Sequence, residues 1–404
     1  MTKRLYYSDS WKKTFSALVT GLKRDEKGDW ICLDQTVFYP EGGGQPCDTG
    51  ILAYDGKTAR VKDVQADEDG FIWHLTEPQN DRLPGIGETV TGEIDWARRY
   101  DFMQQHTGEH ILANSLFELT GGFTHGLYIG QNDASIDVTL KDGKTHLDQD
   151  TLSRIEELAN RHVREDGAIV CRFPEPEEFE TLPLRKAPTV AENIRVCDIG
   201  GYEMVACAGT HLSHASQVGL IKILSAQPAR GKLRLFFLCG QRAVDHYRKI
   251  YTAISRSSAL LSSKEEEVPD RVADLQKQLH NTKSELAALR RKNTLARVPD
   301  LLRDAQTLPD GRRLIACELE ETEFSDMEAL AGALVKESRV LVLLCVKKEG
   351  RRNLLFARSA DLDTNMSDLI KATGAKGGGR PEFARGAADD ALPWEAAKVM
   401  VPHF

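Results

Sequence analysis

The chain has 404 residues, more than one ordinary hydrophobic core organises, so two or three domains are expected. Hydrophobic residues make up 41% and charged residues 28%, which is usual for a globular protein, and no apolar run reaches the roughly 18 residues that span a membrane. The first residues, MTKRLYYSDSWKK, lack the apolar segment of a secretory signal, so a cytoplasmic location is expected. The net charge of −8 excludes nucleic-acid binding over the whole surface and leaves room for local basic faces.

Residues 1–95 are predicted to be β-rich. Short runs of strand-forming residues are separated by glycine, aspartate and proline turn signals, at 16–22, 30–39, 50–55, 59–64 and 70–76. Several short strands without a long helix favour a small barrel or a sandwich.

Residues 96–245 are predicted to form an α/β core. Apolar residues at helical spacing predict a helix over 95–119, ended by Gly121 and Gly122, and an amphipathic helix over 147–165. Strand-like runs complete this core, at 134–140, 168–173, 194–199 and 220–240.

Residues 246–298 are predicted to be a helical linker. A heptad pattern indicates a coiled coil or helical hairpin, which we expect to act as an arm or spacer, through Val268, Val272, Leu275, Leu279, Thr282, Leu286, Leu289 and Asn293. Residues 299–404 alternate strand and helix patterns and predict a small α/β domain that contains a glycine-rich loop. The fold class is therefore α+β and multidomain.

Two pairs of residues carry the candidate chemistry. His106 and His110 lie four apart in the predicted helix, so both imidazoles can reach one metal ion from one helical face. Cys207 and His211 follow a predicted strand about a hundred residues later. One cysteine with three histidines suits zinc in softness and in number. The HExxH motif of metalloproteases does not match, because Thr107 follows the first histidine.

Two glycine motifs are candidate binding elements. FYPEGGGQP, at 38–46, can expose backbone N–H groups to a ligand and adds the amide of Gln45, although a hairpin turn is the usual explanation for such glycines. GAKGGGRPE, at 374–382, interleaves glycines with Lys376 and Arg380, so it is either a phosphate-binding loop or a mobile charged loop. Two stretches are also locally basic, 230–249 and 371–385.

Eight cysteines stand at positions 32, 47, 171, 197, 207, 239, 317 and 345, without a CxxC pair or a regular framework. In a reducing compartment most of them are expected to be small buried apolar residues.

Taken in order, the motifs FYPEGGGQ, QHTGEH, CAGTH and GAKGGGRPEFARG resemble the editing and C-terminal portions of alanyl-tRNA synthetases. Fewer than 40 residues precede the first motif, where a synthetase carries its aminoacylation domain. The chain therefore resembles the long form of the free-standing alanyl-tRNA editing proteins, and no aminoacylation activity is expected. Ala208 is a departure, since the synthetases usually have glycine there.

The resemblance implies one zinc ion at His106, His110, Cys207 and His211, and tRNA(Ala) mischarged with serine or glycine as the substrate. It implies that Thr36 reads a seryl hydroxyl and that Gln45 lines the same pocket. Arg98 and Asp137 are expected behind the ligands or at the tRNA end. The expected substrate contacts in the glycine motifs are Gly42, Gly43, Gly44, Lys376, Gly377, Gly378, Gly379 and Arg380.

Further expectations follow for the reaction and the assembly. Glu109 is a candidate general base, although on a helix it points about 100° away from His110. The C-terminal domain also resembles the one appended to DHH phosphoesterases, and we interpret it as a tRNA-binding and dimerisation module that gives a homodimer. The basic stretches would hold the tRNA backbone. The alternatives are a tRNA-binding protein without activity, a hydrolase of another ester or amide, and a threonyl-tRNA editor with the same HxxxH and CxxxH pattern.

Overall fold

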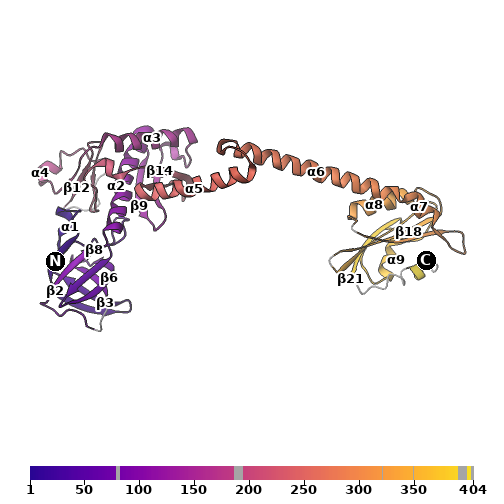
Figure 1. Cartoon of the computed structure of the whole chain (residues 1–404), viewed down its shortest axis with the longest axis horizontal. Coiled ribbons are helices and arrows are strands. Elements are labelled where there is room, and N and C mark those ends of the chain that lie inside the picture. The colour runs from indigo at the N-terminus through magenta and orange to yellow at the C-terminus, as the bar shows by residue number, and fades with distance from the viewer. Residues whose placement is uncertain (79–81, 186–193, 321, 349, 390–397, 402–404) are drawn as a thin grey trace. The chain divides into compact units, whose positions relative to one another are not determined.

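The structure is a computed structural model that describes residues 1–78, 82–185, 194–320, 322–348, 350–389 and 398–401. It contains two compact units, Met1–Ser255 and Arg256–Phe404. Figure 1 colours the first unit from indigo to pink and the second from orange to yellow. No helix in the described ranges is long and apolar enough to cross a membrane.

The first unit begins with a closed barrel (Figure 1). Its antiparallel strands follow the order β2-β3-β7-β6-β5-β8. Alternate residues of β2, such as Phe15, Ala17 and Val19, point into an apolar core and leave the intervening residues exposed. The predicted small barrel is confirmed, with strands β2 (Thr14–Asp25), β3 (Gly28–Leu33), β5 (Gly50–Tyr54), β6 (Lys57–Ala66), β7 (Ile72–Pro78) and β8 (Thr89–Ile94).

Short elements lie beside the barrel. Strand β1 (Lys3–Arg4) leads into helix α1 (Leu5–Ser8) and pairs in parallel with β4 (Gln35–Thr36), immediately before the FYPEGGGQ motif. The motif itself is irregular backbone that connects β4 to β5.

Helix α2 (Trp96–Thr120) leaves the barrel and forms the centre of the unit. The side chain of Asp95 accepts a hydrogen bond from the backbone N–H of Arg98 at its start, and Gly121, with φ of 64°, ends it. Residues 102–113 are all buried although half of them are polar, QQHTGEH among them. Buried polar side chains need partners, so this stretch is where a functional site is expected.

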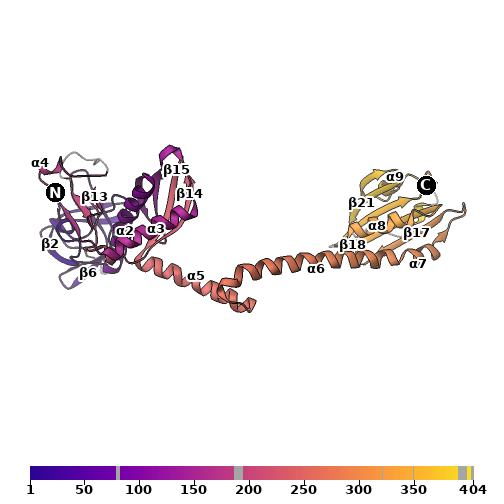
Figure 2. The same ribbon diagram turned by 90° about the horizontal axis from the view of Figure 1, so that it is seen from above.

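Helix α2 contacts the first of two small sheets, which has the order β14-β15-β10-β9. Helix α3 (Gln149–Glu165) packs on α2 and β14, and a three-stranded sheet follows in the order β11-β12-β13. Figure 2 shows α3 and strands β14 and β15 beside α2. The remaining elements are β9 (Phe123–Ile129), β10 (Ala134–Thr139), β11 (Ile169–Arg172), α4 (Pro176–Phe179), β12 (Val196–Ile199), β13 (Glu203–Ala206), β14 (Ile221–Ala229), β15 (Lys232–Cys239) and α5 (Gly240–Leu261).

The second unit begins within the last turns of α5 and continues into the long helix α6 (Val268–Ala296), which covers the predicted heptads. A six-stranded sheet in the order β16-β17-β18-β19-β21-β20 follows, with apolar clusters on both faces. Its elements are α7 (Val298–Arg303), β16 (Gln306–Thr307), β17 (Arg313–Leu319), α8 (Phe324–Leu334), β18 (Val340–Lys348), β19 (Arg351–Arg358), α9 (Met366–Ala372), β20 (Lys376–Arg380) and β21 (Phe383–Asp389).

Two expectations about boundaries and loops change. The predicted glycine-rich loop is wrong for residues 376–380, because these residues form the edge strand β20 paired with β21. The expected linker start at residue 246 falls inside helix α5, which continues from β15 without a break. The start of the α/β core at residue 96, by contrast, coincides with the first residue of α2.

Candidate metal centre

His106 and His110 stand on one face of α2, one turn apart, and both are buried. Their rings stack with centroids 5.1 Å apart. The opposite side of the helix packs closely on β15, because a Cβ atom at Gly108 would lie 2.3 Å from the sulfur of Cys239. The glycine of HTGEH therefore lets the helix approach the sheet, while the two histidines face away from it.

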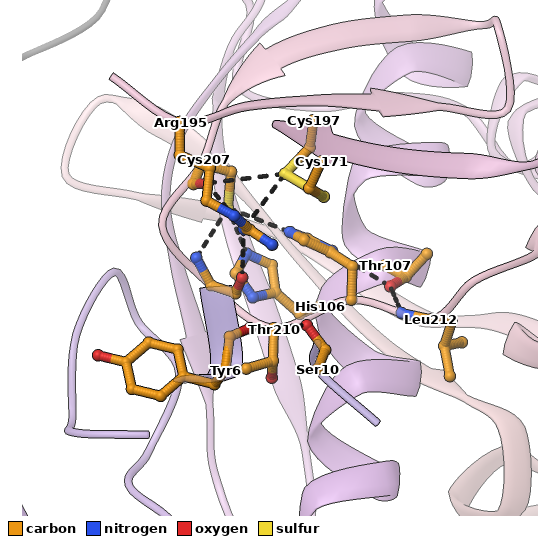
Figure 3. The surroundings of a disulfide bond; sticks show 12 residues. Tyr6, Ser10, His106, Thr107, Cys171, Arg195, Cys197, Cys207, Thr210 and Leu212 are labelled. Carbon is orange, nitrogen blue, oxygen red and sulfur yellow. Dashed lines mark hydrogen bonds between the residues drawn. A yellow bond between two sulfur atoms is a disulfide. The ribbon is translucent and has the colours of Figure 1, made fainter. Parts of the chain in front are cut away.

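Cys207 and His211 come from the loop that follows β13. Figure 3 shows Cys207 next to His106. The sulfur of Cys207 lies 3.4 Å from Nε2 of His106 and 3.3 Å from Nε2 of His211. One ligand atom from each of His106, His110, Cys207 and His211 lies within 4.8 Å of every other. The structure thus brings together the two pairs that the sequence separates by about a hundred residues.

The surroundings of the four side chains fit a soft divalent metal ion. Burial acts to raise the pKa of the Cys207 thiol, but His106 and His211 outweigh it, so the pKa lies well below its usual value. Burial lowers the pKa of His211 to about 3. Thiolate and neutral imidazole are the forms that bind metals. Nε2 of His110 is buried and lacks a hydrogen-bond partner among the described residues, as expected for a nitrogen that awaits a ligand.

Gln45 orients His106. Nδ1 of His106 donates to Oε1 of Gln45 over 2.9 Å, which leaves Nε2 free to face Cys207. The Gln45 amide also donates to Oγ1 of Thr210 over 2.8 Å and accepts from the Thr210 backbone N–H over 3.2 Å. Gln45 is completely buried. Gln45 therefore links the FYPEGGGQ loop to α2 and to the loop that holds Cys207 and His211. Residues that hydrogen-bond to metal-binding histidines commonly fix the orientation of the ring in this way.

The other two histidines also have partners that set the ring orientation. Nδ1 of His211 lies 3.2 Å from Oγ1 of Thr107. Nδ1 of His110 lies 3.6 Å from a carboxylate oxygen of Glu203, whose other oxygen accepts a 2.5 Å bond from Arg185. Burial acts to lower the pKa of His110, but neighbouring groups led by Glu109 raise it well above its usual value. The same carboxylates would strengthen His110 as a ligand.

Three of the four side chains line a cavity of about 470 Å³. His106, His110 and Cys207 reach its wall, together with Gly42 and Gly43 of the barrel loop. Other polar and aromatic residues complete the lining, among them Arg4, Tyr7, Tyr39, Glu109 and Arg185. The cavity is large enough for an amino-acid ester, and its walls come from the barrel, α2, β9 and the Cys207 loop.

Comparison with known proteins shows what this chain is similar to. The family model described as tRNA synthetases class II (A) matches residues 2–98, and the one described as threonyl and alanyl tRNA synthetase second additional domain matches residues 194–235. The alanyl-tRNA editing protein AlaX-L of Pyrococcus horikoshii is 29% identical, in a match that covers 99% of this chain and 98% of that protein. This chain is therefore similar to that editing protein along nearly its whole length.

Alanine–tRNA ligases match nearly the whole of this chain as well. The alanine–tRNA ligases of Ignicoccus hospitalis and Pyrococcus furiosus are 32% and 33% identical over 94% and 96% of this chain, but the matches cover 40% and 42% of the ligases. The chain thus spans about two fifths of the length of these ligases. The crystal structure of the C-Ala domain from Aquifex aeolicus alanyl-tRNA synthetase aligns with 25% of this chain and 96% of that domain, at 20% identity and a TM-score of 0.23.

Two residues that the family resemblance assigned to the pocket have other contacts. Thr36 is completely buried beside the barrel, where its hydroxyl lies 2.9 Å from Nε2 of His74 and accepts from the backbone N–H of Phe38. It is not among the residues that line the described cavity, so the expected direct reading of a seryl hydroxyl is not supported. Arg98 also lies off the cavity, and its Nε donates to the carbonyl of Cys47.

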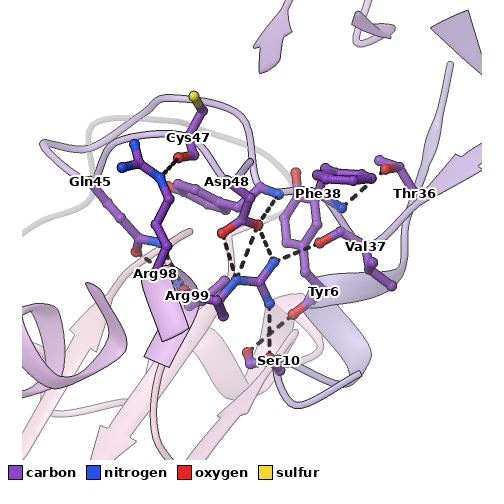
Figure 4. A network of polar contacts seen from close by, with 12 residues as sticks. Tyr6, Ser10, Thr36, Val37, Phe38, Gln45, Cys47, Asp48, Arg98 and Arg99 are labelled. Atoms are coloured by element: carbon purple, nitrogen blue, oxygen red, sulfur yellow. Dashed lines mark hydrogen bonds and ion pairs between the residues drawn. The ribbon is translucent and has the colours of Figure 1, made fainter. Parts of the chain in front are cut away.

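The adjacent Arg99, which the sequence did not single out, makes more buried hydrogen bonds than Arg98 (Figure 4). Its guanidinium is completely buried and donates to both carboxylate oxygens of Asp48, and to the carbonyls of Ser10 and Val37. Asp48 in turn accepts from the backbone N–H of Tyr39. This network fixes both ends of the FYPEGGGQ loop against the start of α2.

Asp137 and Gly44 have structural roles in the sheet. Asp137, on β10, forms a two-point ion pair with Arg234 of β15, at 2.7 and 2.9 Å, outside the cavity lining. This ion pair does not place Asp137 beside the four ligands, and the alternative, a contact at the tRNA end, stays a prediction. Gly44 packs on β9, where a Cβ atom would lie 1.9 Å from the carbonyl oxygen of Leu127. Of the three glycines, Gly42 and Gly43 line the cavity and Gly44 docks the loop on the core.

Glu109 lies closer to the site than the helical geometry predicted. Its carboxylate reaches 3.5 Å from Nδ1 of His110 and lines the cavity. Burial raises the pKa of Glu109. Glu203, Arg185 and Arg195 escaped the sequence analysis, because no local pattern sets them apart from other charged residues.

Proposed function

We propose that this protein hydrolyses the ester bond of tRNA(Ala) that carries the wrong amino acid, chiefly serine and also glycine, without aminoacylation activity of its own. The observation that carries the proposal is the buried set of one cysteine and three histidines that opens on the cavity walled by Gly42 and Gly43. The relative AlaX-L, which this chain matches from end to end, is named an alanyl-tRNA editing protein.

We propose zinc as the metal, held by His106, His110, Cys207 and His211. A zinc ion supplies a Lewis acid that can polarise an ester carbonyl, lower the pKa of water or bind an amino group. A tetrahedral ion with four protein ligands has no open position, so catalysis would require a fifth ligand or the release of one side chain.

We infer that Glu109 serves as the general base. Its carboxylate lines the cavity and is held beside His110. Its raised pKa makes it a stronger base than an exposed glutamate. Both Glu109 and Glu203 face Nδ1 of His110, so Glu109→Gln and Glu203→Gln are both expected to lower metal affinity. Only Glu109→Gln should also lower kcat of the fully metal-loaded protein, and Glu203→Gln is its matched control.

Serine is the better substrate than glycine on physical grounds. A site that hydrogen-bonds a hydroxyl rejects a substrate without it far more strongly than an apolar pocket rejects an added group. Serine differs from alanine by that hydroxyl, whereas glycine offers nothing to recognise. Because the hydroxyl of Thr36 is engaged beside the barrel, we propose that Thr36 acts by holding the start of the FYPEGGGQ loop at Phe38.

We propose that the C-terminal unit contributes contacts to the tRNA backbone through β20. Lys376 and Arg380 are exposed at the two ends of an edge strand whose middle residues are Gly377, Gly378 and Gly379. Without side chains, the middle of this strand lets a phosphate backbone approach closely, and the two cations flank it. The protein would meet charged tRNA in the cytoplasm, where translation uses it.

Helix α6 supports the proposal of a homodimer. Its heptad residues are 42–64% exposed at Val272, Leu275, Leu279, Leu286 and Leu289. Acidic residues precede the helix and basic residues lie near its end, at 265–267 and 290–292. A second copy in antiparallel orientation would cover the apolar stripe and pair these opposite charges. Sedimentation velocity tests this, and a wild-type monomer at micromolar concentration would contradict it.

The decisive experiment follows the release of amino acid from Ser-tRNA(Ala), Gly-tRNA(Ala) and Ala-tRNA(Ala) by the wild type and by His106→Ala. We expect rapid loss of the seryl ester, sparing of the alanyl ester and no reaction in the variant. Binding of tRNA without any deacylation would favour a binding protein. Hydrolysis of Ser-tRNA(Thr) in preference to Ser-tRNA(Ala) would favour a threonyl-tRNA editor, which the second family model also covers.

A further inference from the structure

Cys171 and Cys197 form a disulfide directly beside the metal centre (Figure 3). They occupy opposite positions on the antiparallel strands β11 and β12, with Cα atoms 4.0 Å apart. The sequence showed no cysteine framework, because these two residues lie 26 positions apart and meet only through strand pairing. Neither residue has a part in the proposed hydrolysis.

The disulfide pair shares the neighbour His211 with the first ligand set, which consists of His106, His110, Cys207 and His211. The two sulfur atoms and one ring nitrogen of His211 all lie within 4.8 Å of one another, so Cys171, Cys197 and His211 form a second group with metal-ligand geometry. His211 belongs to both groups. The guanidinium of Arg195 also spans them, since Nη1 lies 3.4 Å from the sulfur of Cys197 and donates to the carbonyl of Cys207.

Solvent can reach the pair from one side. Cys197 is completely buried, whereas Cys171 is partly exposed. A hollow of about 280 Å³ is lined by Cys171, Arg195 and His211, and by residues 7–11. A small oxidant or reductant can therefore reach one sulfur without passing through the substrate cavity. Disulfides that persist in reducing compartments are usually redox-active and not structural.

We propose that Cys171 and Cys197 are a redox-controlled thiol pair which, when reduced, forms with His211 a second binding site for a soft divalent ion such as zinc. In the oxidising step hydrogen peroxide accepts two electrons, the two S–H bonds break, one S–S bond forms, and two water molecules leave. A phosphine with water reverses the step, giving the phosphine oxide and two thiols. Thiolates bind zinc strongly and disulfide sulfurs do not, so the redox state switches the second site on and off.

The switch acts on the first site through His211. Both groups draw on the single His211 ring, so a reduced pair competes with His106, His110 and Cys207 for it. Oxidation removes that competition and leaves the first site its full ligand set. The inference concerns metal binding alone and does not depend on the proposed deacylation.

The test uses Cys207→Ser, which removes the thiol of the first ligand set and keeps the rest of the chain. The variant is reduced with a phosphine and loaded with Co²⁺. The sulfur-to-cobalt charge-transfer band is then recorded before and after the protein is treated with hydrogen peroxide. We expect a band in the reduced variant, roughly twofold stronger than that of the oxidised wild type because two thiolates replace one. The band should disappear after oxidation and in Cys171→Ser/Cys207→Ser.

The absence of a sulfur band in the reduced Cys207→Ser protein, or a band that peroxide and Cys171→Ser leave unchanged, would overturn the proposal. If Cys207→Ser does not fold, the reduced wild type gives a second measurement. Zinc should then slow the alkylation of Cys171, followed by mass spectrometry. An alkylation rate that zinc does not alter would reject the site, whatever the outcome of the deacylation assay.

Discussion

Replacing Gln45 by methionine removes the hydrogen bonds that orient His106 while it keeps the length of the side chain. In the wild type, one buried amide accepts from Nδ1 of His106 over 2.9 Å and donates to Oγ1 of Thr210 over 2.8 Å. The variant leaves both partners without this contact in a region closed to water. The His106 ring is then free to turn or to change its tautomer.

The magnitude follows from these contacts. Loss of an outer partner of a metal-binding histidine lowers metal affinity by about 10- to 100-fold, or about 1.4 to 2.8 kcal/mol. Two buried groups without partners each cost about 1–3 kcal/mol, so the free energy of unfolding should fall by about 2 kcal/mol or more. The metal-free protein should show this second loss as well, because the contacts do not involve the ion.

The assay is a zinc titration in competition with a chromophoric chelator, together with urea unfolding of the metal-free protein. Gln35→Met is the matched control, since Gln35 is a partly exposed glutamine of β4 whose amide donates to the carbonyl of Ser16. It should change stability by about 1 kcal/mol or less and leave zinc affinity unchanged. If Gln45→Met binds zinc as tightly as the wild type, Gln45 does not orient His106, and the reasoning fails.

Three further outcomes are expected. Arg99→Met should lower the free energy of unfolding, measured in urea, by about 3–5 kcal/mol, because it leaves the buried carboxylate of Asp48 without its partner. Arg98→Met, the control, should lower it by about 1 kcal/mol or less. Equal losses in the two variants would contradict the burial argument. Burial lowers the pKa of His74 from 6.5 to about 4, so between these values only the unfolded chain takes up this proton, and stability falls as the pH falls. The loss between pH 7 and pH 5 should be about 2 kcal/mol larger in the wild type than in His74→Gln, and identical losses would show that His74 titrates normally. Lys376→Ala should weaken tRNA binding and lower its salt dependence by about one phosphate contact, with the exposed Lys336→Ala as the control; an unchanged salt slope would remove β20 from the proposed tRNA surface.

The sequence predicted local elements well, because their signals lie within a few residues. Asp95 and Gly121 mark the ends of α2, and the two glycines that follow it stop the helix as expected. The spacing of His106 and His110 placed both on one helical face. Short runs of strand-forming residues between turn signals predicted the barrel strands. The prediction failed for β20, since a glycine-rich segment has no side-chain pattern and becomes a strand only through its pairing with β21.

Neighbouring residues show why the supporting contacts could not be predicted. Arg98 and Arg99 are adjacent in α2 and chemically identical, yet only Arg99 points into the barrel loop and binds Asp48. Their directions differ by about 100°, and the packing of the helix on the barrel decides which one is buried. Thr36 likewise matched the family pattern, while its hydroxyl direction depends on His74 of a strand 38 residues later.

By itself the sequence determined the chemical groups and the local geometry: one thiol and three imidazoles in two short motifs, a helix that presents two of them, and a barrel of short strands. Only the tertiary structure decided which groups meet across long separations. It brought Gln45 to Thr210 over 165 positions, Glu203 to His110, and Cys171 to Cys197 across a strand pair. The physical reason is that backbone preferences act over a few residues, whereas the orientation and protonation of buried polar groups depend on partners that only the packed core supplies.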